Sequence, residues 1–268
     1  SYTLLAFLII PGPGASLNET IEAAALTMGA AYLLAVSMAI YFINHGAQPI
    51  RFRLEAFRPQ TFIRILKQGL VAASQSVMTI MYALTTTLIF SRFGTDWLAG
   101  FGLAVRLELI MVPVIFGIGG SMIAIVGAYV GAGQRKQAIS IAWRGIFINV
   151  ALIGFIGGLL SVFPGSWCGL VGSDAAVIES CSQSLRIVAP AYAFFALGLS
   201  CYLISQALNT LNFPVFGALL RLLIVATGLY WVSSATSIDV VLYLVAGAAI
   251  VYGVVVALGL WLGPWRDK

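Results

Sequence analysis

Two stretches of this chain place polar and aromatic side chains at helical spacing within apolar sequence. The first stretch carries four of them: Gln75, Thr79, Tyr82 and Thr86. The second carries four more: Phe195, Tyr202, Gln206 and Asn209. Residues three, four or seven apart share one face of a helix. A face that mixes aromatic surface with hydrogen-bonding groups is typical of a cleft for amphipathic organic cations or other small molecules. The alternative role is packing between helices, where such hydrogen bonds contribute about 0.6 kcal/mol each.

Three charged residues also fall inside or near the ends of apolar runs: Arg106, Glu108 and Arg221. Arg106 and Glu108 are two positions apart, so they point to different faces of a helix and do not pair with each other. We expect Arg106 to extend outward to the membrane interface and Glu108 to face the cleft or a polar partner, in a structural role. We expect Arg221, near the cytoplasmic end of its helix, to extend its guanidinium to the interface.

The elements that carry these residues are predicted to be membrane helices. Hydrophobic residues make up 61% of the 268 residues, charged residues make up 9%, and the mean hydropathy is +1.02. A soluble domain has about 25% charged residues. Seven apolar runs reach the length of about 20 residues that a span requires; they lie near 23–44, 68–90, 103–130, 138–163, 184–208, 214–235 and 239–263. This composition predicts an all-α, polytopic membrane protein.

Basic charge alternates between successive gaps and so predicts the orientation of the chain. Of the 14 Lys and Arg residues, 11 lie in alternate gaps and in the C-terminal tail. The positive-inside rule places these gaps in the cytoplasm. Loops 45–67 and 131–137 and the C-terminus are then cytoplasmic, and 164–183 faces outward. Because this basic charge borders the membrane, it does not indicate a nucleic-acid partner.

The longest cytoplasmic gap, 45–67, divides the chain into two helical parts. Six spans follow it within residues 68–263, and residues 264–268 form a cytoplasmic tail. Residues 1–44 hold one full span and a short apolar run, Leu4 to Ile10, which cannot cross a bilayer. We therefore expect a truncated chain that lacks the start of this first helix. Within the long run 97–130, Pro113 predicts a break or kink.

The cysteine and histidine content argues against metal and enzyme chemistry. Cys168 and Cys181 flank the outward gap and could pair there, although we expect them and Cys201 to be buried free thiols. The odd count and the absence of CxxC spacing predict no zinc site. A single histidine excludes the HExxH metalloprotease motif, and no GxSxG occurs. We expect neither an enzyme nor a cofactor.

Four stretches in order resemble the MATE (multidrug and toxic compound extrusion) family. Residues 69–76 resemble the G-x-P-x-x-x-Q opening of the family's seventh helix, with Val71 where proline is usual. Residues 92–108 resemble the start of the eighth helix, R-x-G…L-A-x-x-G-I-A-x-R-x-E, and 127–138 resemble its glycine-rich end. Residues 206–209 and 214–221 resemble the end of the tenth helix and the start of the eleventh.

This resemblance implies a fold and an activity. MATE transporters have twelve helices in two six-helix lobes with both termini inside. Residues 1–44 would be the end of the N-terminal lobe, 45–67 the connection between the lobes, and 68–263 the C-terminal lobe. The implied activity is secondary efflux of drugs or toxins by antiport with H⁺ or Na⁺, with alternating access between two lobes. The expected location is a bacterial inner membrane.

The chain departs from the sodium-coupled members of the family. Those members carry a Glu in the seventh helix and an Asp in the tenth, whereas spans 68–90 and 184–208 contain no carboxylate. The resemblance therefore favours the branch named for the DNA-damage-inducible F protein, whose coupling Asp lies in the first helix, outside this chain. The alternatives are a flippase for lipid-linked substrates from the same superfamily and a membrane scaffold that does not transport.

Overall fold

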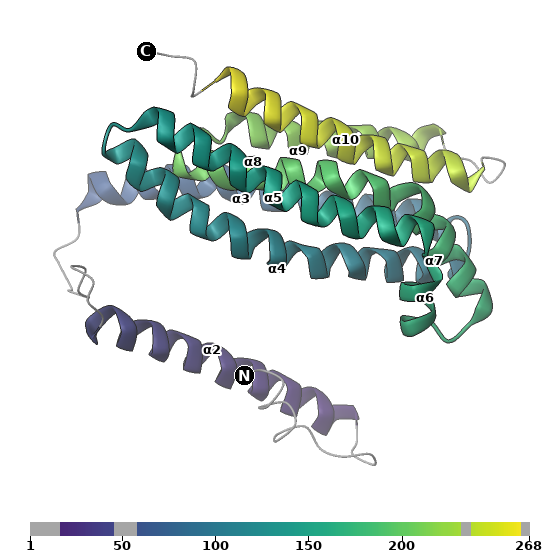
Figure 1. Cartoon of the computed structure of the whole chain (residues 1–268). Helices are drawn as coiled ribbons and strands as arrows, with labels where there is room; N and C mark the ends of the chain where they lie inside the picture. The colour runs from purple at the N-terminus through teal and green to yellow at the C-terminus, as the bar shows by residue number, and fades with distance from the viewer. Residues whose placement is uncertain (1–16, 46–57, 232–236, 264–268) are drawn as a thin grey trace. The chain divides into compact units, whose positions relative to one another are not determined.

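The computed structural model describes residues 17–45, 58–231 and 237–263, and these residues are helical apart from short turns and loops (Figure 1). The helices are α2 (Leu17–His45), α3 (Pro59–Ser91), α4 (Thr95–Gly131), α5 (Arg135–Val162), α6 (Gly165–Val171), α7 (Ala175–Val188), the 3₁₀ turn η1 (Ala189–Ala191), α8 (Tyr192–Ala207), α9 (Asn212–Trp231) and α10 (Ile238–Leu262). Within the described residues, seven segments are long and apolar enough to cross a membrane, with α7, η1 and α8 forming one of them. The seven predicted spans are thereby confirmed.

The chain divides into two compact units at Pro59. The described part of the first unit is the single helix α2, whose hydroxyls bond within the helix: Thr27 donates to the Ala23 carbonyl and Ser37 to the Leu33 carbonyl. Such bonds satisfy polar groups without a partner helix. The predicted partial helix at residues 4–10, most of the connection and the tail 264–268 lie outside the described residues.

The second unit begins at Gln60, within α3, and this helix starts at Pro59 and not near residue 68 as predicted. Proline suits the first turn of a helix because its missing N–H has no acceptor there. Part of the predicted 45–67 connection is therefore helical. At its other end, α3 packs on the bundle through Phe90, whose ring stacks on Phe101 with centroids 3.8 Å apart. Arg92 Nη1 donates to the Leu229 carbonyl at 3.0 Å.

Helix α8 lies at the centre of the second unit, where it packs against α4, α5 and α10. Close approach of the backbones depends on small residues. A Cβ placed on Gly253 of α10 would fall on the Phe194 carbonyl, and one on Gly157 of α5 would fall on the Ala189 carbonyl. Small residues at helix contacts are typical of membrane bundles, where packing replaces the hydrophobic effect.

Helix α4 is continuous across Pro113, so the predicted break is not found. Its 37 residues are more than the bilayer core, about 30 Å thick, requires. A buried polar contact holds this helix to its neighbours: Asn149 of α5 donates to the Ile115 carbonyl at 3.3 Å and to Ser200 Oγ of α8 at 3.0 Å.

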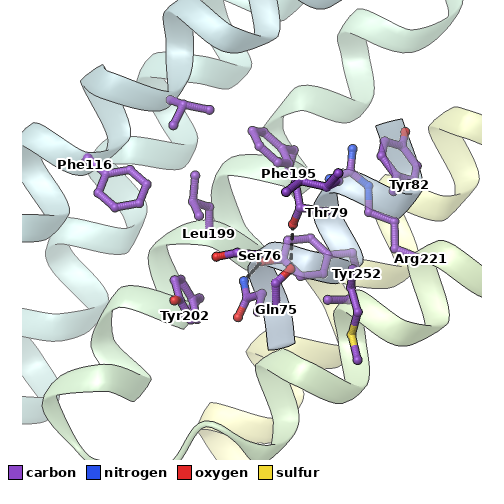
Figure 2. Close-up of a pocket in the computed structure, with 14 residues that line it drawn as sticks. Gln75, Ser76, Thr79, Tyr82, Phe116, Phe195, Leu199, Tyr202, Arg221 and Tyr252 are labelled. Carbon is purple, nitrogen blue, oxygen red and sulfur yellow. Dashed lines mark hydrogen bonds between the residues drawn. The ribbon is translucent and has the colours of Figure 1, made fainter. Parts of the chain in front are cut away.

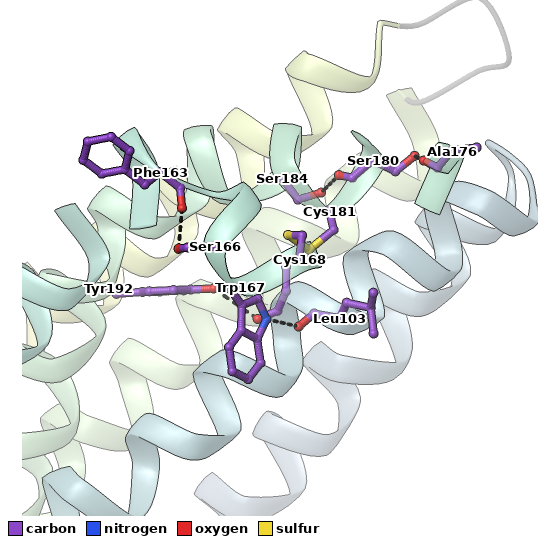
Figure 3. The surroundings of a disulfide bond; sticks show 11 residues. Leu103, Phe163, Ser166, Trp167, Cys168, Ala176, Ser180, Cys181, Ser184 and Tyr192 are labelled. Carbon is purple, nitrogen blue, oxygen red and sulfur yellow. Dashed lines mark hydrogen bonds between the residues drawn. A yellow bond between two sulfur atoms is a disulfide. The ribbon is translucent and has the colours of Figure 1, made fainter. Parts of the chain in front are cut away.

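A disulfide joins Cys168 of α6 to Cys181 of α7, with the two Cα atoms 6.0 Å apart (Figure 3). Our expectation of free thiols at these two positions is wrong, whereas Cys201 is free and buried as expected. The short helix α6 turns the chain back onto α7 at Gly172, where Ile178 and the Cys168 carbonyl leave no room for a Cβ. This reversal places the two sulfur atoms side by side, which sequence spacing alone does not reveal.

Candidate functional site

A pocket of about 350 Å³ lies within the second unit, lined by residues from α3, α4, α8, α9 and α10 (Figure 2). Five of its lining residues are predicted cleft residues, namely Gln75, Thr79, Tyr82, Phe195 and Tyr202. Arg221 also lines the pocket, although the sequence analysis placed its guanidinium at the cytoplasmic interface. The polar face of α3 therefore meets the aromatic face of α8 in space. The remaining lining residues are mostly apolar, and they include Phe116 of α4 and Leu199 of α8.

The other three predicted cleft residues lie outside this pocket. Thr86 is buried, but its hydroxyl is within hydrogen-bonding distance of the Ala83 carbonyl at 2.8 Å and the Tyr82 carbonyl at 3.1 Å. Gln206 is half-buried, and Asn209 is exposed. Helix α8 ends at Ala207, and Asn209 has a φ of 60°, a conformation that asparagine adopts readily just after a helix. The polar face that Tyr202 belongs to therefore does not extend to Asn209, because the helix ends before that residue.

Gln75 and Tyr252 meet at the pocket. Gln75 is 6% exposed, and its Nε2 donates to the Tyr252 hydroxyl at 3.3 Å. Its Oε1 is buried and has no hydrogen-bond partner among the described residues. The amide therefore keeps one unused polar group at the wall of the pocket. Sequence analysis missed Tyr252; the available signal was a polar aromatic residue in the middle of an otherwise apolar span.

Arg221 pairs with Glu108 in the interior of the second unit. Its Nη2 lies 3.2 Å from Glu108 Oε1, an ion pair that joins α9 to α4. Arg221 is 7% exposed and lies near the middle of α9, so the expected extension to the cytoplasmic interface is wrong. A buried cation requires a charged partner, and Glu108 supplies it. This contact also agrees with the expectation that Glu108 faces a polar partner.

Aromatic rings surround the guanidinium of Arg221. Its Cζ lies 3.9 Å from the centroid of Tyr82, 5.1 Å from Phe195 and 5.8 Å from Tyr252. Distances within about 6 Å allow cation–π attraction. Arg221 Nε is buried and has no acceptor among the described residues. The guanidinium is thus held by rings and one carboxylate, and it retains an unused donor.

Arg106 takes no part in this cluster. It is exposed and lines a separate hollow near the N-terminus of α7, together with Gly102 and Asp174. Asp174 itself caps α7 by accepting a hydrogen bond from the Ala176 N–H at 2.8 Å. The placement of Arg106 and Glu108 on different faces follows from their spacing.

The chemistry of the pocket is that of binding. Its wall is mainly aromatic and aliphatic, with a few polar groups, which is the usual character of small-molecule sites in proteins. Among the described lining residues there is no carboxylate, and Arg221 is the only charged one. Glu108 contacts this arginine but does not itself line the pocket.

Comparison with known proteins identifies relatives of this chain. A family model described as MatE matches residues 72–232. This match contains all the predicted cleft residues and both members of the Glu108–Arg221 pair, but not Tyr252. No curated protein matches the chain.

Several solved structures share the fold. A MATE structure in complex with MaL6 superposes with a TM-score of 0.82 at 13% identity, covering 97% of this chain and 59% of that one. A MOP superfamily transporter from Pyrococcus furiosus gives a TM-score of 0.81 at 16% identity, covering 100% of this chain and 61% of that one. The MATE transporter ClbM in complex with Rb⁺ gives 0.75 at 16% identity, covering 100% and 59%. This chain therefore spans about three fifths of the length of these transporters.

Proposed function

This chain belongs to the MatE family, and on that premise we propose that it exports small amphipathic molecules by antiport with H⁺ or Na⁺. The observation that carries this proposal is the pocket between α3 and α8–α10. It combines aromatic walls with a few polar side chains in the middle of helices that are apolar enough to span a membrane. The resemblance to transporters supports the same activity.

Transport by alternating access requires two lobes that close around a site. We propose that residues 68–263 supply the C-terminal lobe and residues 1–44 the end of the other lobe. Among the described residues, none that lines the pocket is a carboxylate able to carry the coupling ion. We propose that a carboxylate elsewhere in the transporter carries the ion, as in the branch named for the DNA-damage-inducible F protein.

We further propose that the protein lies in a bacterial inner membrane with its C-terminus in the cytoplasm. The charge alternation supports this orientation. The disulfide Cys168–Cys181 supports it independently, because it lies in the gap predicted to face outward, and disulfides persist in oxidising compartments such as the periplasm. On a Cys201→Ala background with the disulfide intact, a membrane-impermeant maleimide should label Asp174→Cys from outside and leave Arg135→Cys unlabelled. The reverse pattern contradicts the orientation.

Uptake into everted membrane vesicles tests the transport proposal. Two permanently charged probes serve, naphthalene-2-sulfonate and trimethyl(2-naphthylmethyl)ammonium, with an imposed H⁺ or Na⁺ gradient. We expect gradient-dependent uptake of at least one probe, abolished or strongly reduced in Tyr82→Ala. Leu84→Ala on the same helix is the matched control, because Leu84 is 53% exposed and does not line the pocket. Equal uptake in vesicles with and without the protein contradicts the proposal.

A further inference from the structure

We propose that Arg221 forms a subsite for the anionic head group of an amphipathic aromatic molecule, whose ring system lies against the aromatic wall of the pocket. This inference rests on the proposed function, because it specifies the substrate class of the same pocket. It differs from the sequence-based expectation of organic cations. Its basis is the charge, the unused hydrogen-bonding groups and the size of the pocket.

The charged group in the pocket wall is a cation. Among the described lining residues Arg221 alone is charged, while its partner Glu108 lies outside the lining. A ligand in the pocket lies closer to the lining member of the ion pair than to its partner. It therefore experiences the charge of the lining member more strongly. In a site of low dielectric, such a charge attracts an anion and repels a cation over several ångströms.

Three of the five aromatic rings that line the pocket, those of Tyr82, Phe195 and Tyr252, already lie within cation–π distance of Arg221. The guanidinium lies 3.9 Å from the Tyr82 ring and 5.1 Å from the Phe195 ring, where it makes the cation–π contacts itself. A second cation on these rings would meet a like charge. The rings can still pack against an apolar body, because stacking of this kind does not require a charge.

Two hydrogen-bonding groups remain for a ligand. Among the described residues, Arg221 Nε has no acceptor and Gln75 Oε1 has no donor. Arg221 Nε can donate to a ligand anion, whereas Gln75 Oε1 can only accept from a ligand O–H or N–H. Both side chains are more than nine-tenths buried and both line the pocket. Tyr252 connects them, since its hydroxyl accepts from Gln75 and its ring lies 5.8 Å from the guanidinium. Arginine binds carboxylate and sulfonate oxygens with strong, charge-assisted hydrogen bonds.

The size of the pocket limits the ligand. Its volume of about 350 Å³ lies near the lower end of the range for small-molecule sites. It is large enough for a bicyclic aromatic body with one head group. The inferred ligand is therefore a compact organic anion such as an aromatic carboxylate or sulfonate.

Binding measured by titration calorimetry tests this inference. The protein is placed in phosphatidylcholine nanodiscs, and the heat from empty nanodiscs is subtracted. We expect naphthalene-2-sulfonate to bind more tightly than trimethyl(2-naphthylmethyl)ammonium. Arg221→Gln should weaken binding of the sulfonate by about tenfold or more, since hydrogen bonds to charged groups contribute at that level. Arg144→Gln is the control, because Arg144 is exposed on α5 and does not line this pocket.

Removing the charge of the partner carboxylate, Glu108, should have the opposite effect on sulfonate binding. Glu108 competes with a bound anion for the guanidinium, so Glu108→Gln should tighten sulfonate binding several-fold. A purely structural ion pair would lose binding in both variants. Because Arg221→Gln leaves Glu108 without its partner, the double variant Glu108→Gln/Arg221→Gln shows whether weak binding survives when charge balance is restored. Circular dichroism and a single unfolding transition establish that each variant is folded.

The outcomes separate this inference from the proposed function. Unchanged sulfonate affinity in folded Arg221→Gln, or in the folded double variant, overturns the anion subsite. Tighter binding of the ammonium probe, lost in Tyr82→Ala, also overturns it but leaves the transport proposal intact. Failure of both probes to bind, together with absence of gradient-driven uptake, contradicts both proposals.

Discussion

Two regions of the second unit differ in whether their polar groups have partners. Where α6 meets α7, the side chains bond to one another or to the backbone. A disulfide closes the turn, Asp174 caps α7, and the Trp167 indole donates to the Leu103 carbonyl at 3.0 Å. In the pocket beside α3, Gln75 Oε1 and Arg221 Nε have no partner among the residues that the structure describes. The first region holds helices together, whereas the second has the unused groups that a ligand requires.

Removing the carboxylate of the Glu108–Arg221 ion pair should have the largest effect on stability. Glu108→Ala leaves the buried Arg221 without its carboxylate, and breaking a buried pair in this way costs about 4 kcal/mol. The double variant Glu108→Gln/Arg221→Gln should recover most of this loss, because no charge is then left unpaired. Unfolding in detergent with increasing denaturant measures both. Equal stability of Glu108→Ala and the unmodified protein would show that the pair is not electrostatically important.

Removing the disulfide should have the second largest effect on stability. Cys168 and Cys181 are separated by 13 positions, and closing a loop of that length contributes about 3 kcal/mol to the stability. Cys168→Ser/Cys181→Ser should therefore lower the unfolding midpoint, and a reductant should do the same to the unmodified protein but not to this variant. Cys201→Ala is the control and should keep the response to reductant. If a reductant leaves the unfolding midpoint of the unmodified protein unchanged, the presence of this disulfide is contradicted.

A close backbone contact in the packed interior offers a smaller effect. Gly253→Ala places a methyl group on the Phe194 carbonyl, so α10 must shift away from α8. Overpacking of this kind costs about 2 kcal/mol. Gly247→Ala on the same helix is the matched control, since a Cβ there meets nothing within 4 Å. If both substitutions have the same effect on the free energy of unfolding, the assignment of a close contact between α8 and α10 is contradicted.

The helix cap should have the smallest effect of the four. Asp174→Ala removes the acceptor for the Ala176 N–H and should cost about 1 kcal/mol. Asp96→Ala, which removes an exposed carboxylate from the first turn of α4, serves as the comparison because Asp96 does not cap that helix. A loss for Asp96→Ala that equals or exceeds the loss for Asp174→Ala would contradict the assigned cap. Neither change should alter binding in the pocket, which lies on other residues.

The sequence predicted well what depends on local pattern. Apolar run length located the seven spans within the described residues. Helical spacing placed Gln75, Thr79 and Tyr82 together on the α3 face that lines the pocket. These properties follow from the geometry of one helix, for which neighbouring residues in the sequence are sufficient.

What the sequence did not predict depends on contacts between distant segments. Arg221 and Glu108 are 113 positions apart, and nothing in either helix alone indicates that they meet. The burial of Tyr252 against Gln75 is likewise a product of packing. The prediction that Asn209 lines the cleft was wrong for another reason. Its spacing continues the polar face of α8, but the helix ends before this residue. Helical spacing has meaning only as far as the helix extends.

Photo-crosslinking tests most directly whether the pocket is the ligand site. A naphthalene-2-sulfonate that carries a diazirine is irradiated with the protein in nanodiscs, and the modified peptides are identified by mass spectrometry. We predict adducts on the pocket segments 75–82 of α3 and 195–202 of α8, suppressed by an excess of unmodified naphthalene-2-sulfonate. Adducts confined to lipid-exposed positions such as Leu84, with no protection by the competitor, would contradict the account.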